Sequence, residues 1–314
     1  MDRESERLKL LGAFGMIGES FRVISARKKL FSQITLALIL PLSLLLLSHS
    51  IVSDLVLDNS DGHDGSGTKR GLAVNLSVSV AYFTLVFLLS IIAIAEVAYA
   101  TACVYASKDV TFGKITAATF KIWTRLAVTF LWFFLLYIAF TLVFALFFEF
   151  AMLLMKVAKP VGVFLGIVVP IAYLVGVFYI TIVMQTASVM SVLEDNYGRP
   201  ALKKSRGLLK GKLGSVVGYF LLIILCLGLI EFAFGILVAT GYIVHSVVVR
   251  VVLGIFLWFL LVIPNLVCLV GSTVVYFVCK SHHGERIDMA LLEDRLKVYR
   301  EAKIVQLGQP QPPV

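Results

Sequence analysis

The sequence predicts an all-α integral membrane protein with six transmembrane helices, arranged as three helical hairpins. Two observations carry this prediction. First, 60% of the 314 residues are hydrophobic, only 15% are charged and the mean hydropathy is +0.96, whereas a soluble domain is typically about 45–50% apolar and about 25% charged. Second, six apolar runs each exceed the roughly 20 helical residues that cross a bilayer core.

The apolar runs divide the chain into three regions. Residues 1–30 are predicted to form a cytosolic N-terminal amphipathic helix, and residues 31–279 the six-span membrane domain. Residues 280–314 are predicted to form a cytosolic helix followed by a disordered tail. The predicted spans are 31–57, 76–106, 122–154, 161–190, 213–240 and 242–279.

The distribution of Lys and Arg predicts the orientation of these spans. Of the 28 basic residues, 23 lie in the terminal segments and in every second loop, and five lie on the other side of the predicted spans. Because basic residues favour the cytosolic side, both termini are expected in the cytosol. We expect the protein in the secretory pathway, in the endoplasmic reticulum or the plasma membrane. The net charge of +9 sits in short blocks beside spans, which argues against a nucleic-acid partner.

A basic amphipathic stretch leads directly into a span three times. Each repeat would then consist of a cytosolic interfacial helix, a span that leaves the cytosol and a span that returns to it. The six spans would therefore form a pseudo-threefold bundle. The alternative is that any basic loop before a span looks similar. The three stretches are Glu19–Leu40, Thr111–Leu131 and Arg199–Leu222.

The first stretch carries an apolar stripe with helical periodicity. Its members recur every three or four residues, which places them on one face of a helix. Such a helix lies in the headgroup plane of the membrane or packs under the bundle. The stripe consists of Leu10, Phe14, Ile17, Phe21 and Ile24.

The third stretch is the most basic and is our candidate for contact with acidic lipid. Cations beside an anionic membrane surface contribute about 1 kcal/mol each. Ordinary positive-inside anchoring explains the same residues, and a protein partner at the cytosolic face is a further alternative. The candidates are Lys203, Lys204, Arg206, Lys210 and Lys212.

Three ionisable residues inside predicted spans are the intramembrane candidates: Glu96, Glu231 and Arg250. Charged side chains within a bilayer are rare and often functional. Glu231 and Arg250 each lie nine or ten residues from the turn between the last two spans, which places them at one depth. We therefore predict an ion pair between them, with a structural role or a role in a permeation path.

Two blocks of the sequence carry a family resemblance. They are ESFRVISARKKLFSQI, from Glu19 to Ile34, and SVLEDNYGRPALKKSRGLLKGK, from Ser191 to Lys212. They resemble a plant family of six-span membrane proteins of unknown biochemistry. That family is distantly similar to the membrane domain found beside some glycerophosphoryl diester phosphodiesterases. The resemblance implies fold and topology over most of the chain. It implies no catalytic residue, because the phosphodiesterase chemistry belongs to a separate soluble domain.

No catalytic motif is visible in the chain: it has no Walker-type phosphate loop, no G-x-S-x-G and no H-E-x-x-H. We therefore expect no enzymatic activity, no cofactor and no metal. The sequence favours a non-enzymatic membrane protein that engages acidic lipids or a membrane partner through basic cytosolic helices, in membrane organisation or trafficking. The alternative is a transporter or channel that uses Glu96, Glu231 and Arg250.

Overall fold

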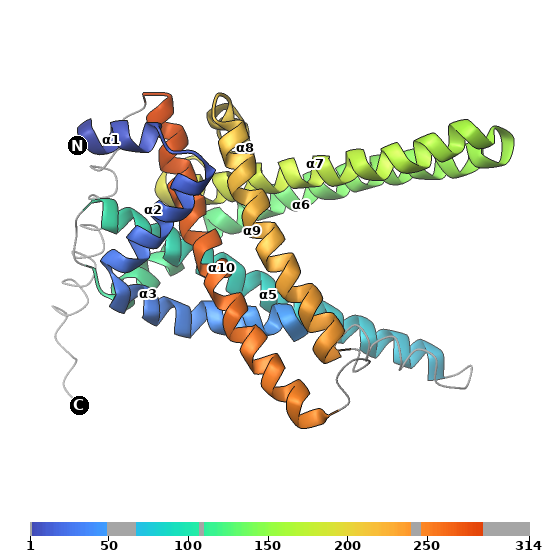
Figure 1. The fold of residues 1–314 in the computed structure, drawn as a ribbon, viewed down its shortest axis with the longest axis horizontal. Helices are drawn as coiled ribbons and strands as arrows, with labels where there is room; N and C mark the ends of the chain where they lie inside the picture. The colour runs from blue at the N-terminus through green and yellow to red at the C-terminus, as the bar shows by residue number, and fades with distance from the viewer. Residues whose placement is uncertain (1, 49–66, 107–109, 240–245, 285–314) are drawn as a thin grey trace, which may run out of the picture. The chain divides into compact units, whose positions relative to one another are not determined.

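The computed structural model describes residues 2–48, 67–106, 110–239 and 246–284 (Figure 1). Within these ranges the regular elements are helices and no strand occurs. Six helical segments are long and apolar enough to cross a membrane. The predicted all-α fold with six candidate spans is confirmed. The C-terminal helix and tail predicted within residues 285–314 lie outside the described residues.

The helices and their bounds, in chain order, are α1 Asp2–Lys9, α2 Ala13–Ala26, α3 Lys28–Ile34, η1 Thr35–Ile39, α5 Gly67–Tyr105, α6 Phe112–Val157, α7 Lys159–Leu193, α8 Arg199–Leu209, α9 Leu213–Phe234, η2 Gly235–Ala239 and α10 Val247–His282. The elements η1 and η2 are single π-helical turns. Residues 40–48 continue the first span as α-helix.

The candidate spans of the structure are Lys28–Ser48, Ser77–Tyr105, Ile122–Val157, Lys159–Leu193, Leu213–Ala239 and Val247–His282. The third and fourth are longer than the apolar runs from which they were predicted, because the helices continue through Lys156 and from Lys159 onward. At about 1.5 Å per residue, the third span is about 54 Å long. A bilayer core is about 30 Å thick, so this helix must tilt or project beyond the lipid.

The described chain consists of two compact units. Unit 1 contains Met1–Ala13, Lys121–Val217 and Val275–Val314, and unit 2 contains Phe14–Phe120 and Gly218–Val274. The helices α6 and α10 each contribute to both units. The domain boundaries predicted at residues 30 and 279 stay predictions.

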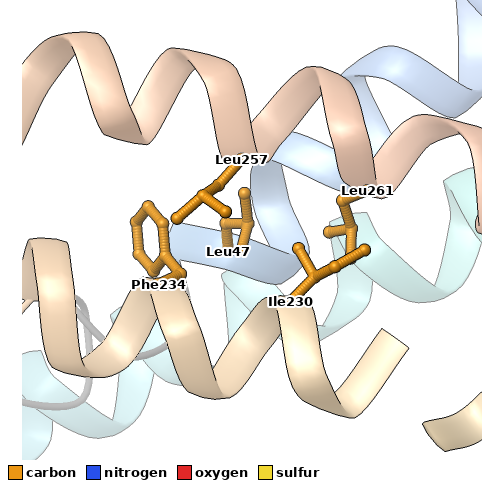
Figure 2. Packing of buried hydrophobic residues seen from close by; sticks show 5 residues of the cluster. All are labelled: Leu47, Ile230, Phe234, Leu257 and Leu261. Atoms are coloured by element: carbon orange, nitrogen blue, oxygen red, sulfur yellow. The ribbon is translucent and has the colours of Figure 1, made fainter. Parts of the chain in front are cut away.

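The core of unit 2 joins the first span to α9 and α10. Leu47 packs with Ile230 and Phe234 of α9 and with Leu257 and Leu261 of α10 (Figure 2). Truncating such a buried leucine to alanine typically lowers stability by about 2–5 kcal/mol. Two hydrogen bonds connect the same helices, from Trp258 Nε1 to the Leu40 carbonyl at 3.1 Å and from Asn265 Nδ2 to Ser43 Oγ at 3.1 Å.

The core of unit 1 includes the hairpin of α6 and α7, whose two helices are joined at Ala158. Close approach of these helices depends on glycine: a Cβ atom at Gly162 would lie 2.4 Å from the backbone nitrogen of Met155. Further along, Tyr173 of α7 stacks on Phe140 and contacts Phe144 of α6, with ring centroids 5.9 and 5.7 Å away. These contacts hold the hairpin together, and most other large apolar side chains of the two helices are exposed.

One end of each of the helices α5, α7 and α10 is buried on every side. The buried stretches are residues 93–103 of α5, 186–193 of α7 and 270–280 of α10. A helix that protein encloses on all faces keeps water away from its polar side chains, so these side chains need hydrogen-bond partners within the protein. These stretches contain Glu96, Tyr276 and Lys280, and Glu194 follows the second of them directly.

Candidate functional site

The basic helix α8 begins at a glycine-dependent turn in unit 1. Gly198 has φ +67°, a conformation that side chains rarely adopt, and its backbone N–H donates to Thr129 Oγ1 of α6 at 2.8 Å. A Cβ atom at this position would also lie 3.2 Å from the Trp132 side chain. The turn therefore sets the direction in which α8 leaves α7.

The two faces of α8 differ in character. Ala201, Ser205, Leu208 and Leu209 are buried, and the Ser205 hydroxyl donates to the Val183 carbonyl of α7 at 3.1 Å. This contact and the apolar face orient the helix against the rest of unit 1.

The opposite face of α8 carries three exposed cations, and a fourth follows directly after the helix. Arg199, Lys203 and Arg206 lie at positions i, i+4 and i+7, which share one side of a helix, and Lys210 follows Leu209, the last residue of α8. We call this set the α8 cationic stripe: Arg199, Lys203, Arg206 and Lys210. Within the part of the chain that the structure describes, none of these four side chains forms an ion pair with an acidic residue.

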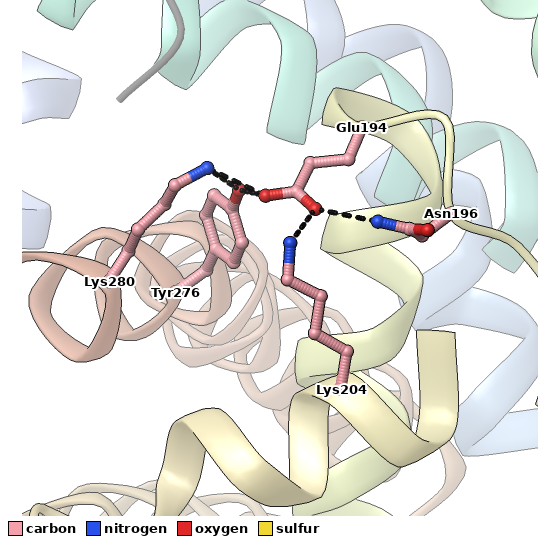
Figure 3. A network of polar contacts seen from close by, with 5 residues as sticks. All are labelled: Glu194, Asn196, Lys204, Tyr276 and Lys280. Carbon is pink, nitrogen blue, oxygen red and sulfur yellow. Dashed lines mark hydrogen bonds and ion pairs between the residues drawn. The ribbon is translucent and has the colours of Figure 1, made fainter. Parts of the chain in front are cut away.

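Glu194 lies at the end of α7 and contacts two basic residues that do not belong to the stripe, Lys204 and Lys280 (Figure 3). Its Oε2 accepts from Lys204 Nζ at 2.7 Å and from Asn196 Nδ2 at 3.1 Å. Its Oε1 accepts from Lys280 Nζ and from the Tyr276 hydroxyl, each at 2.6 Å. The carboxylate therefore ties α8 to the end of α10 within unit 1.

The electrostatics of this network favour an ionised Glu194. Burial by itself raises the pKa of the carboxyl, but the hydrogen bonds from Lys204, Lys280 and Tyr276 outweigh burial and lower the pKa to about 2. The side chain of Lys280 is only 8% exposed. Glu194 thus neutralises a cation that would otherwise be buried without a partner.

The five predicted lipid-contact residues therefore separate into two groups. Lys203, Arg206 and Lys210 are exposed on the stripe. Lys204 pairs with Glu194, and Lys212 Nζ donates to the Leu11 carbonyl at 3.4 Å. A run of basic residues in the sequence gives no information on which of its members have internal partners.

Two arginines of unit 1, one of them in the stripe, lie over aromatic rings. The guanidinium of Arg199 lies 4.6 Å from the ring centroid of Trp132, which is 37% exposed. Arg125 lies 5.9 Å from the ring of Tyr197 and pairs with Asp195 at 2.7 Å. Trp and Tyr beside cations are typical of the level where lipid headgroups meet hydrocarbon. Arg199 was not among the predicted residues, although its spacing from Lys203 is visible in the sequence.

The buried face of α2 in unit 2 has a mixed character, because it contains Met16, Glu19, Ser20 and Val23. Phe14 is 79% exposed and Phe21 is 47% exposed. Of the apolar stripe predicted from the sequence, Leu10, Phe14 and Phe21 are exposed, whereas Ile17 and Ile24 are half-buried. The polar residues of the buried face are satisfied locally, because Glu19 Oε1 accepts from Arg22 at 3.0 Å and from the Tyr105 hydroxyl at 3.2 Å.

The intramembrane candidates Glu231 and Arg250 lie in unit 2. Arg250 donates from Nε to the Val238 carbonyl at 2.9 Å and from Nη2 to the Ala239 carbonyl at 3.1 Å. The last carbonyls of a helix have no partner within that helix, so Arg250 caps the end of η2. Glu231 is exposed on α9. Their predicted ion pair stays a prediction.

Glu96 is the candidate with the most enclosed environment. Its side chain is 1% exposed in the buried stretch of α5. The Oε2 atom of the carboxyl has no hydrogen-bond partner among the described residues. No group of three His, Cys, Asp or Glu side chains that could hold a metal ion occurs in the described ranges.

The profile of a family described as a domain of unknown function, DUF8558, matches residues 1–309. The chain belongs to the DUF8558 family. No curated protein and no solved structure matches it. This DUF8558 protein is thus a multi-pass helical protein whose role must be inferred from its own residues.

Proposed function

We propose that this DUF8558 protein is a non-enzymatic membrane protein that binds anionic lipid headgroups through the α8 cationic stripe. One observation carries the proposal. Lys203, Arg206 and Lys210 are exposed together without an acidic partner among the described residues, whereas their neighbour Lys204 pairs with Glu194 at 2.7 Å. The fold thus neutralises one cation of α8 and leaves a row of others for an external anion.

The outward apolar face of α2 supports a lipid environment on independent grounds. A helix in water normally turns its polar face outward and its apolar face toward the core. In α2 Phe14 and Phe21 are exposed, whereas the polar Glu19 and Ser20 are buried beside the apolar Met16 and Val23. Lipid hydrocarbon is the solvent that stabilises such an arrangement.

The orientation and the cellular role follow from the charge distribution. The stripe belongs to the segments that carry 23 of the 28 basic residues, so it faces the cytosol if the positive-inside rule holds. The cytosolic leaflet carries the anionic lipids. We infer an integral protein of the endoplasmic reticulum or plasma membrane that organises membrane or assists trafficking.

The expected strength of the interaction is moderate. Each cation near an anionic membrane contributes about 1 kcal/mol, so removing two of them weakens lipid preference by about 2 kcal/mol. A change of about 1.4 kcal/mol is tenfold in an equilibrium constant. Salt screens exposed charges beyond a Debye length of about 8–10 Å, so the preference declines as ionic strength rises.

Spin-labelled lipids test the proposal on the full-length protein in phosphatidylcholine vesicles. The ratio of association constants for labelled phosphatidylserine and labelled phosphatidylcholine is measured for the native chain and for Lys203→Gln/Arg206→Gln. The expected result is a loss of about 30-fold in that ratio for the double variant, by the same 1 kcal/mol per cation. The matched control is Lys156→Gln/Lys159→Gln, which removes two exposed cations at the α6–α7 turn.

An unchanged ratio in Lys203→Gln/Arg206→Gln would overturn the proposal. An equal loss in both double variants would also overturn it, because the effect would then reflect net charge alone. Capture of a soluble cytosolic protein by the stripe, with no lipid preference, would assign the surface to a protein partner instead.

A further inference from the structure

The C-terminal end of α8 is capped by a histidine that follows α10. The last four carbonyls of an α-helix have no partner within that helix. In α8 the Gly207 carbonyl accepts from the backbone N–H of Lys210 at 3.1 Å. The Leu208 carbonyl instead lies 3.0 Å from Nε2 of His283, and the same nitrogen lies 3.0 Å from the Lys210 carbonyl. His283 thus holds the end of α8 within unit 1.

The two carbonyls determine which ring nitrogen of His283 carries a proton. A carbonyl oxygen only accepts hydrogen bonds, so Nε2 must donate, both in the neutral and in the charged ring. An added proton therefore binds Nδ1 and breaks neither hydrogen bond. His283 is exposed, and a cation at the C-terminus of a helix is stabilised by the helix dipole. The ring can thus become charged in place.

Cations dominate the charged groups on the elements that meet at this end of α8. Glu194 pairs with Lys280 at 2.6 Å, and no acidic side chain in the described ranges pairs with His283. A charged His283 would therefore add to the positive field at this end of the α8 cationic stripe. The other charged or titratable groups among the described residues are Arg206 on α8, Lys210 and Lys212 after it, Glu194 after α7, and Cys279, Lys280 and His282 on α10.

The neighbouring His282 has a different environment. Its Nδ1 is buried and has no hydrogen-bond partner within the part of the chain that the structure describes. Its Nε2 lies against Gly211, where a Cβ atom would be 2.9 Å away. A proton on Nδ1 would place a charged donor in a site without an acceptor, which is unfavourable. His282 is therefore a matched control for His283.

We propose that His283 is a proton-dependent member of the anion-binding surface at α8, which binds anionic lipid more tightly when the ring is charged. Histidine is the side chain whose charge ordinarily changes between pH 5 and 8. The ring contacts the carbonyl of Lys210, so the added charge lies at the end of the stripe. This inference rests on the proposed lipid binding by the α8 cationic stripe.

Lipid association at two pH values tests the inference on the full-length protein. Spin-labelled phosphatidylglycerol and phosphatidylcholine are compared at pH 8 and pH 5.5, because neither headgroup changes its charge in this range. One added cation beside an anionic surface raises the ratio of association constants by up to about fivefold. We expect this rise on acidification of the native chain.

Three variants locate the proton. His283→Gln keeps an N–H donor for the two carbonyls but gains no charge, so it should lose the rise. His283→Arg carries a permanent charge and should show the higher ratio at both pH values. His282→Gln should keep the full rise of the native chain.

A preference for phosphatidylglycerol that is the same at pH 8 and pH 5.5 would overturn this inference and leave the α8 proposal intact. A rise that persists in folded His283→Gln, or that disappears in His282→Gln, would assign the proton to another group and overturn it as well. Equal association of the two lipids at both pH values would overturn both proposals.

Discussion

The helices α2 and α8 are both short, amphipathic and adjacent to a span, yet they turn opposite faces away from the protein. In α8 the buried face is Ala201, Ser205, Leu208 and Leu209, and the outward face is cationic. In α2 the buried face contains Glu19 and Ser20 beside Met16 and Val23, and the outward face contains Phe14 and Phe21. From this difference we propose that α2 faces lipid hydrocarbon and α8 the headgroup layer.

The largest expected effect comes from the residue that orients α8. In Glu194→Ala, Lys280 and Tyr276 lose a shared acceptor in a site where the Lys280 side chain is 8% exposed. Removing one partner of a buried ion pair typically lowers stability by about 3–5 kcal/mol. Chemical denaturation in detergent should therefore show a loss of this size. A loss below about 1 kcal/mol, the value typical of exposed pairs, would mean that the Glu194 network does not position α8.

Acid titration gives the next largest effect. The pKa of Glu194 is lowered from 4.5 to about 2, so its contribution to stability is fully present above about pH 4.5. That contribution is lost as the pH falls toward 2, because protonation becomes more favourable in the unfolded chain. A shift of this size corresponds to about 3 kcal/mol. Unfolding free energies between pH 5 and pH 2 should fall more steeply for the native chain than for Glu194→Gln, and parallel curves would contradict the assignment.

Replacing an apolar residue on the outward face of α2 should have an intermediate effect on the stability of the helix, and this effect should depend on whether lipid or water surrounds that face. Replacing an apolar side chain that is immersed in lipid loses roughly 1.5–3 kcal/mol of transfer free energy when burial is complete. Phe21 is partly covered, so Phe21→Ser should weaken α2 by about 1 kcal/mol, seen as faster amide exchange in bilayers. The matched variant is Ser25→Ala, at another exposed position of α2, which should leave the exchange unchanged. Unchanged exchange in Phe21→Ser would place this face in water.

The smallest effect separates two neighbouring cations of α8. Lys204→Gln removes a partly exposed ion pair with Glu194, which is worth about 1 kcal/mol or less after solvent screening. Lys203→Gln removes a cation without an acidic partner among the described residues, so its effect on unfolding should stay within about 0.5 kcal/mol. In contrast, Lys203→Gln should reduce the preference for phosphatidylserine more than Lys204→Gln does. A larger loss of phosphatidylserine preference in Lys204→Gln than in Lys203→Gln would contradict the assignment of Lys203 to lipid and Lys204 to Glu194.

Hydropathy and helical periodicity predicted much of the fold and some of the site. Long apolar runs need no tertiary information to be recognised as spans, and the spacing of Phe14 and Phe21 shows that they share a face. Periodicity does not indicate which face is covered by protein. The burial of Glu19 depends on Tyr105, 86 positions away in the chain, so the inversion of α2 could not be predicted.

The site residues that sequence reasoning missed depend on contacts between distant segments. Glu194 acquires its role from Lys280, which is also 86 positions away. Arg250 was a predicted site residue, but its hydrogen bonds to the carbonyls at the end of η2 were not foreseen; its ion pair with Glu231 stays a prediction. A π-helical turn leaves no clear mark in hydropathy, so these acceptors were not visible beforehand.

Site-directed spin labelling tests the difference between α2 and α8 most directly. Nitroxides are placed at positions 14 and 21 of α2 and at positions 203 and 206 of α8, in a full-length background in which the four native cysteines are replaced. Collision with oxygen reports hydrocarbon, and collision with a water-soluble nickel complex reports the aqueous headgroup layer. We predict that oxygen dominates at positions 14 and 21 and nickel at 203 and 206. The same collision preference at both helices would contradict the account.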